Sequence, residues 1–258
     1  QKPDGNIVVD KLLSENPTAY KDAAIAGIKR ILGLNITDSI PTNKISSVKM
    51  GTTVATNALL ERKGDRTLLL ITEGFGDLLR IGYQNRPLLF DLEIKLPELL
   101  YEKVIEIPER LDSNGKVIKK LDTQKARKAL KEAKQGGIDS VAIAFMHSYV
   151  NSEHENKIAE IAREENFNQI SISHKVSPLI KLVGRGDTTV ADAYLSPILR
   201  RYVNQVSEEL KDSKSTKLMF MQSNGGLTDA HLFQGKDALL SGPAGGVVSM
   251  TETGKQAG

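Results

Sequence analysis

The stretch Lys49–Gly64, KMGTTVATNALLERKG, decides the fold because it takes the chain from the end of a strand through a turn into a helix. Ile45 and Val48 indicate the buried strand that precedes the turn. Apolar residues then recur at helical spacing, and Gly64 stands where a glycine would cap the helix. The next segment, Thr67–Thr72 (TLLLIT), is continuously apolar, which is typical of a strand buried on both faces. Strand, helix and strand in this order predict an α/β unit with a parallel sheet.

The turn within this stretch, Gly51-Thr52-Thr53, has two interpretations. A helix that begins at Val54 leaves its first backbone N–H groups without partners, and such a terminus attracts phosphate or carboxylate. The alternative is an ordinary strand–helix junction in which the threonines cap the helix. The residues by themselves leave both interpretations open.

Strands and helices alternate along most of the chain. Glu73–Leu100 is punctuated by glycine and proline and predicts an ordered loop with short helices, a kind of loop that tends to be functional. The helix expected at Val190–Leu210 contains Pro197, which predicts either a kink or the first turn of a new helix. The segment 101–175 is interpreted as a second α/β unit. The other expected elements are strands at Asn6–Leu13, Pro41–Met50, Asp139–Met146, Ile170–Ser173 and Lys217–Met221, a β-hairpin across Tyr101–Leu121, and helices at Thr18–Leu32, Thr123–Gln135, Glu153–Glu165 and Ala244–Thr251.

Composition narrows the class of protein. The 258 residues are 40% hydrophobic, enough for a substantial core, and they contain neither Cys nor Trp. Without cysteine there is no disulfide and no thiol chemistry, which fits a reducing compartment, so we expect a cytoplasmic protein. The net charge of +3 arises from 35 basic and 32 acidic residues and does not call for nucleic acid. No run approaches the roughly 20 apolar residues that span a bilayer, so no membrane association is expected.

Two glycine-rich motifs follow in the last third of the chain. Ser223-Asn224-Gly225-Gly226 comes directly after a predicted parallel strand, where α/β folds place ligands, and its alternative is a simple turn. Ser241-Gly242-Pro243-Ala244-Gly245-Gly246 begins a helix in which Gly245 and Gly246 cost about 1 kcal/mol each relative to alanine. Close helix packing or approach of a ligand would compensate for that cost.

A third motif, Lys181–Thr189, is expected to be a glycine-rich loop that gathers Arg185, Asp187 and Thr188. The arginine can hold a carboxylate or phosphate through two hydrogen bonds, and the aspartate can position water or a metal. A solvated loop with a local Arg–Asp pair is the alternative. The four histidines show no helical i, i+4 metal spacing, so no metal site is predicted within this chain.

Several longer stretches together resemble one family. GTTVATNALLERKG (51–64), LLLITEGFGDLLRIGYQNRPLLFDL (68–92), AIAFMHSYVNSEHE (142–155), TTVADAYLSPILRRYV (188–203) and MQSNGGLTDAH with LLSGPAGGVVSM (221–250) occur in the expected order. This order is similar to the N-terminal portion of the hydantoinase A/5-oxoprolinase family, which includes ATP-dependent N-methylhydantoinases.

The resemblance implies a fold and a division of the chain. The fold would be α/β, part of an actin-like (ribonuclease H-like) ATPase lobe with an inserted α/β subdomain. Residues 1–177 would be the hydantoinase/oxoprolinase N-terminal-type region, with an actin-like part at 1–72 and an inserted loop and α/β unit at 73–177. Residues 178–258 would begin a truncated hydantoinase A-type domain whose 241–251 helix connects the lobes.

The resemblance also implies an activity and its cofactors. Members open cyclic amides such as 5-oxoproline or hydantoins after ATP phosphorylates the amide oxygen. They hold ATP with two glycine-rich hairpins of DxGGT type, and these 258 residues contain neither hairpin. We therefore expect a fragment that is inactive alone, with ATP and Mg bound by the full-length parent and not tightly by this chain. The candidate cleft residues are Gly51, Thr52, Thr53, Asn57, Arg185, Asp187, Thr188, Ser223, Asn224, Gly225, Gly226, Ser241, Gly242, Gly245 and Gly246.

Two other functions fit the same sequence. One is a subunit of the acetone or acetophenone carboxylase type, and the other is a non-catalytic interaction module on an actin-like scaffold. For the hydrolase, we expect a small cyclic amide as substrate and either a partner subunit of the hydantoinase B type or a homo-oligomer. No residue is assigned as the catalytic base.

Overall fold

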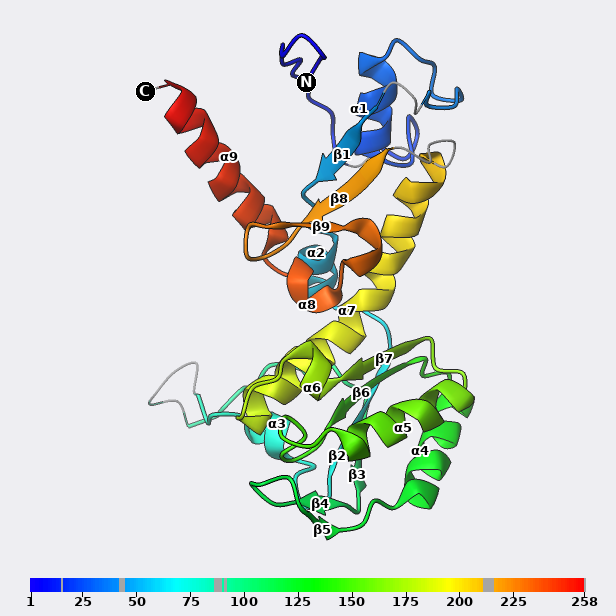
Figure 1. The fold of residues 1–258 in the computed structure, drawn as a ribbon, viewed down its shortest axis with the longest axis vertical. Helices are drawn as coiled ribbons and strands as arrows, with labels where there is room; N and C mark the ends of the chain where they lie inside the picture. Colours follow the sequence, from blue (N-terminus) through cyan, green and yellow to red (C-terminus); the bar gives the residue numbers. More distant parts are fainter. Residues whose placement is uncertain (15, 42–44, 86–89, 91, 211–215, 258) are drawn as a thin grey trace.

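The computed structural model describes residues 1–258 except 15, 42–44, 86–89, 91, 211–215 and 258. It consists of two lobes joined by one long helix, α7 (Leu182–Glu209) (Figure 1). The large-sheet lobe contains four parallel strands in the order β3-β2-β6-β7, and the small-sheet lobe contains three strands in the order β1-β8-β9. The strands are β1 (Ser47–Met50), β2 (Thr67–Thr72), β3 (Lys103–Ile107), β6 (Ser140–Ala144), β7 (Gln169–Ile172), β8 (Lys217–Met221) and β9 (Leu227–Asp229).

The two central strands of the large sheet, β2 and β6, are buried at every position, and their apolar side chains cover both faces of the sheet. Leu68 and Leu70 pack on one face with α4 (Thr123–Gln135) and α5 (Glu153–Glu164). Leu69 and Ile71, which alternate with them along β2, pack on the other face with the first half of α7. This alternation explains the continuous run TLLLIT, since neighbouring residues of a strand point to opposite faces.

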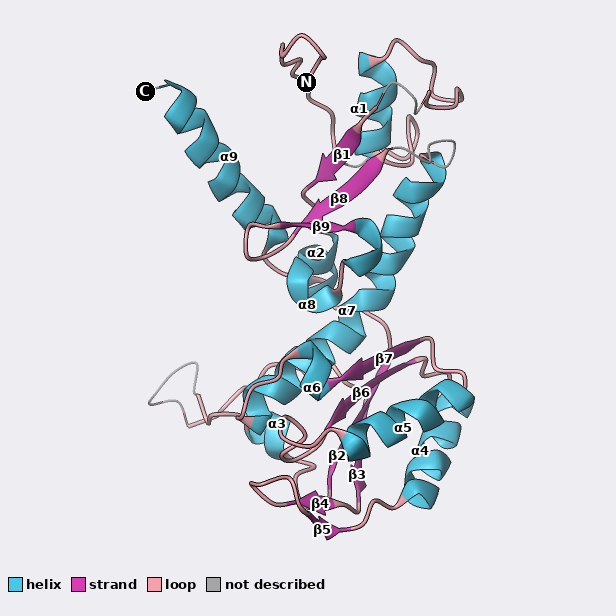
Figure 2. Cartoon of the chain, viewed as in Figure 1, coloured by secondary structure: helices cyan, strands magenta, loops and turns pink. Residues whose placement is uncertain are grey.

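The small-sheet lobe has its own core. Met50 and Phe220, which are register partners in the parallel β1–β8 pair, pack with the second half of α7 and with α1 (Ala23–Ile31) and α2 (Val54–Leu60). Phe220 also stacks on Phe233, with ring centroids 5.0 Å apart. The remaining elements are the short α3 (Leu78–Ile81), β4 (Arg110–Leu111), β5 (Val117–Lys119), α6 (Ser173–Val176) and α8 (Gly235–Ala238) and the long α9 (Ser241–Ala257) (Figure 2). A 3-10 helix, η2 (Ala230–Leu232), lies between β9 and α8 in the sequence.

The chain crosses from the small-sheet lobe to the large-sheet lobe between α2 and β2. There the backbone N–H of Asp65 donates to the carbonyl of Tyr194 on α7 at 3.0 Å, and Arg201 forms an ion pair with Asp65 at 2.7 Å. A Cβ atom at position 64 would lie 2.2 Å from the Tyr194 ring. Glycine at this position therefore lets the crossing segment pack against α7.

Several predictions around this crossing are wrong. Gly64 does not cap α2, because the helix ends at Leu60 and Arg62 takes the left-handed conformation there (φ 55°). β1 and β2 do not share a sheet, since the crossing segment separates them. Of the two alternatives for Pro197, a kink or a new helix, the new helix is excluded because α7 continues through it.

Two predicted β elements are also corrected. No strand forms at Asn6–Leu13, where Ile7 and Val9 are largely exposed and no described strand supplies hydrogen-bond partners. The hairpin predicted across Tyr101–Leu121 is confined to β4 and β5, because β3 pairs with β2 in parallel. The intervening Pro108 carries no N–H group to continue a ladder.

Most other elements agree with the sequence. The structure confirms the mixed α/β class, the bounds of β2, β8 and α4, and the loop with a short helix across 73–100. Part of that loop, 86–89 and 91, lies outside the described residues, as do 42–44 of the predicted strand Pro41–Met50. The domain boundaries at 72 and 177 stay a prediction, although β2 pairs with β3 and β6 rather than with β1.

Candidate functional site

Three predicted segments meet at one edge of the small sheet. β1 and β8 are parallel, so the turn 51–53 that follows β1 and the turn 223–226 that follows β8 leave the sheet on the same side. The start of α9, residues 241–246, packs against both turns. Ligands of open α/β sheets bind outside the carboxyl ends of the strands, which is where these segments lie.

Hydrogen bonds hold the starts of α2 and α9 together. Ser241 is fully buried, and its Oγ lies 2.8 Å from the carbonyl of Thr52 and 2.9 Å from that of Ala238. One turn further along α2, the Thr56 hydroxyl donates to the carbonyl of Leu239 at 2.6 Å. A Cβ atom at Gly242 would approach Thr53 Cγ2 to 2.8 Å, so glycine is what permits this contact. Close packing, one of the two interpretations of the 241–246 motif, accounts for Gly242.

The segment Ser223–Gly226 is the turn of the β8–β9 hairpin. Gly225 has a φ of 83°, which a side chain disfavours, and the N–H of Gly226 donates to Asn224 Oδ1 at 2.8 Å. The N–H and the hydroxyl of Ser223 both donate to the carbonyl of Asp237 at 2.7 Å, and its hydroxyl accepts from the N–H of Leu240 at 3.0 Å. The side chains of this turn therefore serve its own geometry and its attachment to α8.

The helix terminus at α2 is partly capped. Thr53 occupies the cap position without a side-chain cap bond, while Thr52 Oγ1 accepts from the N–H of Val54 at 3.2 Å. The capping interpretation thus holds for Thr52. Thr53 and Asn57 are exposed, as is Gly51.

Some positions at this edge leave room for another molecule. A Cβ atom added at Gly51 or at Gly246 would meet no atom within 4 Å. Gly245 lies further in, where an added Cβ would stand at ordinary contact distance, 3.7 Å, from Met221. At this edge, closely packed residues lie beneath accessible backbone and exposed hydroxyl and amide groups.

Two residues at this edge have no signal in the sequence. Asp237 on α8 is half-buried, and desolvation raises the pKa of its carboxyl, with Asp192 adding to the shift. Burial raises the pKa of the phenol of Tyr202 on α7, and the nearby Asp22 carboxyl adds to the shift. Asp237 lies outside the motifs, and Tyr202 lies in the family stretch 188–203 without a signal of its own, so only the fold brings them to the turn at 51–53 and the adjoining α8.

The prediction that Arg185 lies in a ligand-binding loop is wrong. Residues 182–189 form the first turns of α7, and the Arg185 side chain is fully buried in the large-sheet lobe. Its guanidinium donates to Ser173 Oγ at 2.9 Å, to the carbonyl of Phe145 at 2.6 Å and to that of Leu179 at 2.5 Å. Desolvation lowers the pKa of Arg185, and the nearby Glu155 opposes that effect. Arg185 therefore fastens α7 to the ends of β6 and β7.

Glu155 completes this buried network. It accepts hydrogen bonds from the N–H of Phe145 at 2.8 Å, from Ser173 Oγ at 2.6 Å and from His174 Nδ1 at 2.6 Å. Such multiple donation is what allows a carboxylate and a guanidinium to be buried near one another. The motif at 142–155, from which Phe145 and Glu155 come, is thereby explained as structural.

Asp187 and Thr188 are likewise separated from the small-sheet edge. The Thr188 hydroxyl donates to the carbonyl of Gly184 within α7 at 2.8 Å. Asp187 is exposed on the surface of α7. The glycines that suggested a loop instead permit packing, because a Cβ atom at Gly186 would lie 2.8 Å from Leu79 on α3. Of the candidate residues, the structure thus brings together those of 51–57, 223–226 and 241–246, and leaves 185, 187 and 188 in the other lobe.

Within the part of the chain that the structure describes, no group of three or more His, Cys, Asp or Glu side chains is arranged to hold a metal ion. In the same part of the chain, no helix combines the length and apolar character needed to cross a membrane.

The architecture defines a mixed α/β protein whose solved neighbours have the actin-like ATPase fold. The ATP-dependent caprolactamase from Pseudomonas jessenii superposes with a TM-score of 0.72 at 29% identity, over 86% of this chain and 33% of that one. Acetone carboxylase, in its nucleotide-free structure, superposes with a TM-score of 0.74 at 21% identity, over 89% of this chain and 34% of that one, which shows the fold alone.

The chain belongs to the hydantoinase/oxoprolinase family. Residues 1–166 match the hydantoinase/oxoprolinase N-terminal region, and residues 185–258 match the hydantoinase/oxoprolinase domain. 5-Oxoprolinase 1 of Arabidopsis thaliana is 42% identical over 276 residues, which cover 97% of this chain and 22% of that protein. The chain thus spans about a fifth of the length of this curated relative.

Proposed function

We propose that this chain is part of an ATP-dependent hydrolase that opens cyclic amides of the 5-oxoproline or hydantoin type through a phosphorylated amide. Family membership and the 42% identity to a protein named 5-oxoprolinase 1 support the reaction class. The solved neighbour named an ATP-dependent caprolactamase points the same way, since a lactam is a cyclic amide. The observation that carries the proposal is the meeting of 51–53, 223–226 and 241–246 at the carboxyl edge of the small sheet.

This edge fits one side of a nucleotide cleft. The open positions at Gly51 and Gly246 let a ligand approach the backbone closely, and Thr53 and Asn57 present exposed polar groups. These groups suit contacts to phosphate or ribose. Mg prefers carboxylate and water oxygens, and the half-buried Asp237 is one carboxylate that this part of the fold contributes. We propose that further Mg ligands and the phosphate-binding hairpins belong to the longer parent protein, so that this chain alone binds Mg-ATP weakly and does not hydrolyse it.

A carboxylase-type subunit is the second candidate. The likeness to the acetophenone carboxylase gamma subunit of Aromatoleum aromaticum favours it, at 26% identity over 93% of this chain and 36% of that protein. Assays of the parent protein with ATP and 5-oxoproline, with ATP and N-methylhydantoin, and with ATP, acetone and bicarbonate distinguish the two. Ring opening coupled to ATP hydrolysis supports the hydrolase, whereas bicarbonate-dependent consumption of the ketone contradicts it.

The role of the small-sheet edge is tested by one substitution in the parent. Gly242→Ala places a methyl group 2.8 Å from Thr53 Cγ2 and should lower kcat/KM for ATP-dependent ring opening, by roughly tenfold if close positioning is lost. Gly254→Ala, on the same helix and with nothing within 4 Å, is the matched control and should leave activity unchanged. Equal activity of the two variants would argue against a cleft at this edge.

We further propose a partner subunit of the hydantoinase B type or a homo-oligomer. Exposed apolar residues on α9, such as Val247 and Met250, are consistent with a covered face in the assembled protein. The cytoplasmic location also stays a proposal, which the absence of cysteine supports. Sedimentation of the parent with and without its co-purified proteins tests the assembly.

A further inference from the structure

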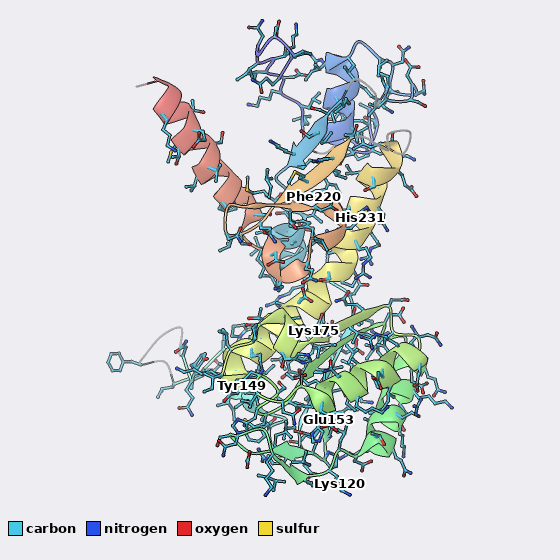
Figure 3. The ribbon with its side chains drawn as sticks, in the orientation of Figure 1. Lys120, Tyr149, Glu153, Lys175, Phe220 and His231 are labelled. Atoms are coloured by element: carbon cyan, nitrogen blue, oxygen red, sulfur yellow. The ribbon has the colours of Figure 1, made fainter. Side chains whose placement is uncertain are left out.

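A crevice separates the two lobes on the side of β7. It lies between β7 and α6 of the large-sheet lobe and η2 and Gln234 of the small-sheet lobe, and α7 forms its back wall. Its volume is about 430 Å³, within the range of about 300–1,000 Å³ typical of small-molecule sites. Figure 3 labels Lys175 in the large-sheet lobe and His231 in the small-sheet lobe, which both line the crevice.

Positive charge dominates the lining of this crevice. Arg163 of α5, Lys175 of α6 and Arg200 of α7 reach it from three different helices. Among the described lining residues, Asp192 supplies the carboxylate, and it is buried. The three cations, which are all exposed residues at the crevice, therefore outnumber the one carboxylate, and such a concentration of positive charge attracts anions.

The oxygens of Asp192 are already engaged. Oδ2 accepts from Ser171 Oγ at 2.6 Å, and Oδ1 accepts from Ser196 Oγ at 3.0 Å and from the N–H of Lys236 at 3.1 Å. These bonds tie β7, α7 and α8 together. Asp192 thus stabilises the junction of the lobes and does not neutralise the cations that line the crevice.

The cations differ in how they are held. Arg200 donates to the carbonyl of Asn168 at 3.2 Å and to Gln169 Oε1 at 2.5 Å, which fixes its guanidinium at the crevice. Arg163 and Lys175 form no ion pair within 4 Å with any residue that the structure describes. Glu160, three residues before Arg163 on α5, pairs with Lys157 at 2.9 Å, which lowers the pKa of the Glu160 carboxyl, and Arg163 helps to lower it further. One fixed and two adaptable cations are a suitable arrangement for an oxyanion, since arginine bonds phosphate through two N–H groups and lysine acts as a point charge.

We propose that this crevice binds a small dianionic oxyanion, a phosphate group either free or carried by a small metabolite. The site is distinct from the small-sheet edge and does not depend on the proposed hydrolase activity. Residues of both lobes line it, so a bound anion stabilises one relative position of the lobes and raises the stability of the folded chain by mass action.

The test is isothermal titration of this chain with inorganic phosphate, glycerol 3-phosphate and succinate, each at low ionic strength. Phosphate and glycerol 3-phosphate should bind and should raise the Tm. Binding of phosphate alone identifies the free ion as the ligand, and tighter binding of glycerol 3-phosphate identifies a carried phosphate group. Binding of succinate alone would overturn the choice of phosphate.

Substitutions locate the binding. Lys175→Gln and Arg163→Gln should each weaken phosphate binding about tenfold, the loss expected for one charge-assisted hydrogen bond. Lys131→Gln, an exposed lysine on α4 that does not line the crevice, is the matched control and should bind like the wild type. The variants are surface changes, and far-UV circular dichroism checks that they fold. Absence of phosphate binding up to millimolar concentration, or equal binding by all three variants and the wild type, would overturn the proposal.

Discussion

Tyr194 determines which residue can stand at position 64. Its ring fills the space that a Cβ atom would occupy there, so the crossing segment and α7 fit together only with glycine. Gly64→Ala should destabilise the chain by about 1–3 kcal/mol, because overpacking forces the backbone or the ring to move. Urea unfolding measures the change.

The control for this substitution is Gly254→Ala. Gly254 lies in α9 with nothing near its missing Cβ, so alanine should be neutral or should stabilise the helix by up to about 1 kcal/mol. The double variant Gly64→Ala/Tyr194→Leu should recover part of the loss. If Gly64→Ala and Gly254→Ala had the same stability, the close contact with Tyr194 would not exist in solution.

Asp237 should make stability depend on pH. Desolvation raises the pKa of its carboxyl in the folded state above the ordinary value of 3.8, so the folded chain binds this proton more tightly than the unfolded chain does. Stability is then lost as pH rises from the unfolded pKa through the folded pKa. Asp237→Asn removes the cost of ionisation and should raise the Tm at pH 7, with a smaller gain at pH 4.

Thermal melts between pH 4 and pH 7 measure this effect. Glu132→Gln on the exposed face of α4 is the control, and its Tm should differ little from that of the wild type at either pH. A gain for Asp237→Asn that stayed constant over this range would show that ionisation of Asp237 is not its cause.

At the scale of elements, α9 is a helix that tertiary packing stabilises over only part of its length. It extends away from the small-sheet lobe beyond its first turns, and residues 247–255 are exposed (Figure 1). Helices in proteins are stabilised mainly by packing of an apolar face, and α9 packs only near its start. Its amides beyond Val247 should therefore exchange with solvent faster than those of α4, which lies on the large sheet.

Hydrogen exchange followed by mass spectrometry compares the two helices. α4 has 13 residues and is packed through Ala126 and Leu130, so it is the internal reference. Equal protection of α9 and α4 in a chain shown to be monomeric would contradict the expectation. Protection that appeared only in the parent protein would show that another part of the assembly covers α9.

The sequence predicts correctly those helices and strands whose hydrophobic pattern fits only one type of secondary structure. Thr67–Thr72 has four consecutive apolar residues between two threonines, and Thr123–Gln135 has an apolar stripe at helical spacing, and both bounds agree with the structure. Glycine can indicate either a loop or a close contact within a helix. The sequence does not distinguish the two, so the glycines of 181–189 predict a loop. There Gly184 and Gly186 lie within α7 and admit neighbouring side chains, a requirement that only tertiary contacts reveal.

Part of the candidate site could also be predicted, because three of its motifs have positions in the sequence that indicate where they lie in the fold. The motifs at 51–53, 223–226 and 241–246 follow strands or start helices, so their common location follows from the parallel pairing of β1 and β8. Asp237 and Tyr202 could not be predicted, because each is brought to this edge by contacts between distant elements. Arg185 was assigned to the site because an isolated arginine in a sequence gives no sign of being buried.

At the scale of the molecule, α7 couples the two lobes. Val190 and Ala193 belong to the core of the large-sheet lobe, and Leu199 and Val203 belong to the core of the small-sheet lobe. If either core unfolds, about half of α7 loses the packing contacts that stabilise it. Unfolding in urea should therefore be one cooperative transition, with the same midpoint by far-UV circular dichroism and by tyrosine fluorescence, which tryptophan does not obscure here.

Leu69→Ala tests the coupling. Leu69 is fully buried in the large-sheet lobe, and its truncation should cost about 2–5 kcal/mol and shift both probes by the same amount. Two separate transitions, with only one of them moved by the substitution, would show that the lobes unfold independently.

The order β1-β8-β9 has a practical consequence. Among the described residues β1 pairs with β8 alone, so one side of β1 presents unpaired backbone groups at the margin of the sheet. Such a margin is a template on which a second strand, including one from another copy, can be added, and it is a common origin of aggregation. The exposed Lys49 in the middle of this short strand places a charge where strands of two copies would meet. The colloidal behaviour of the purified chain should therefore depend on this lysine, and Lys49→Val should lower its solubility limit without altering its fold.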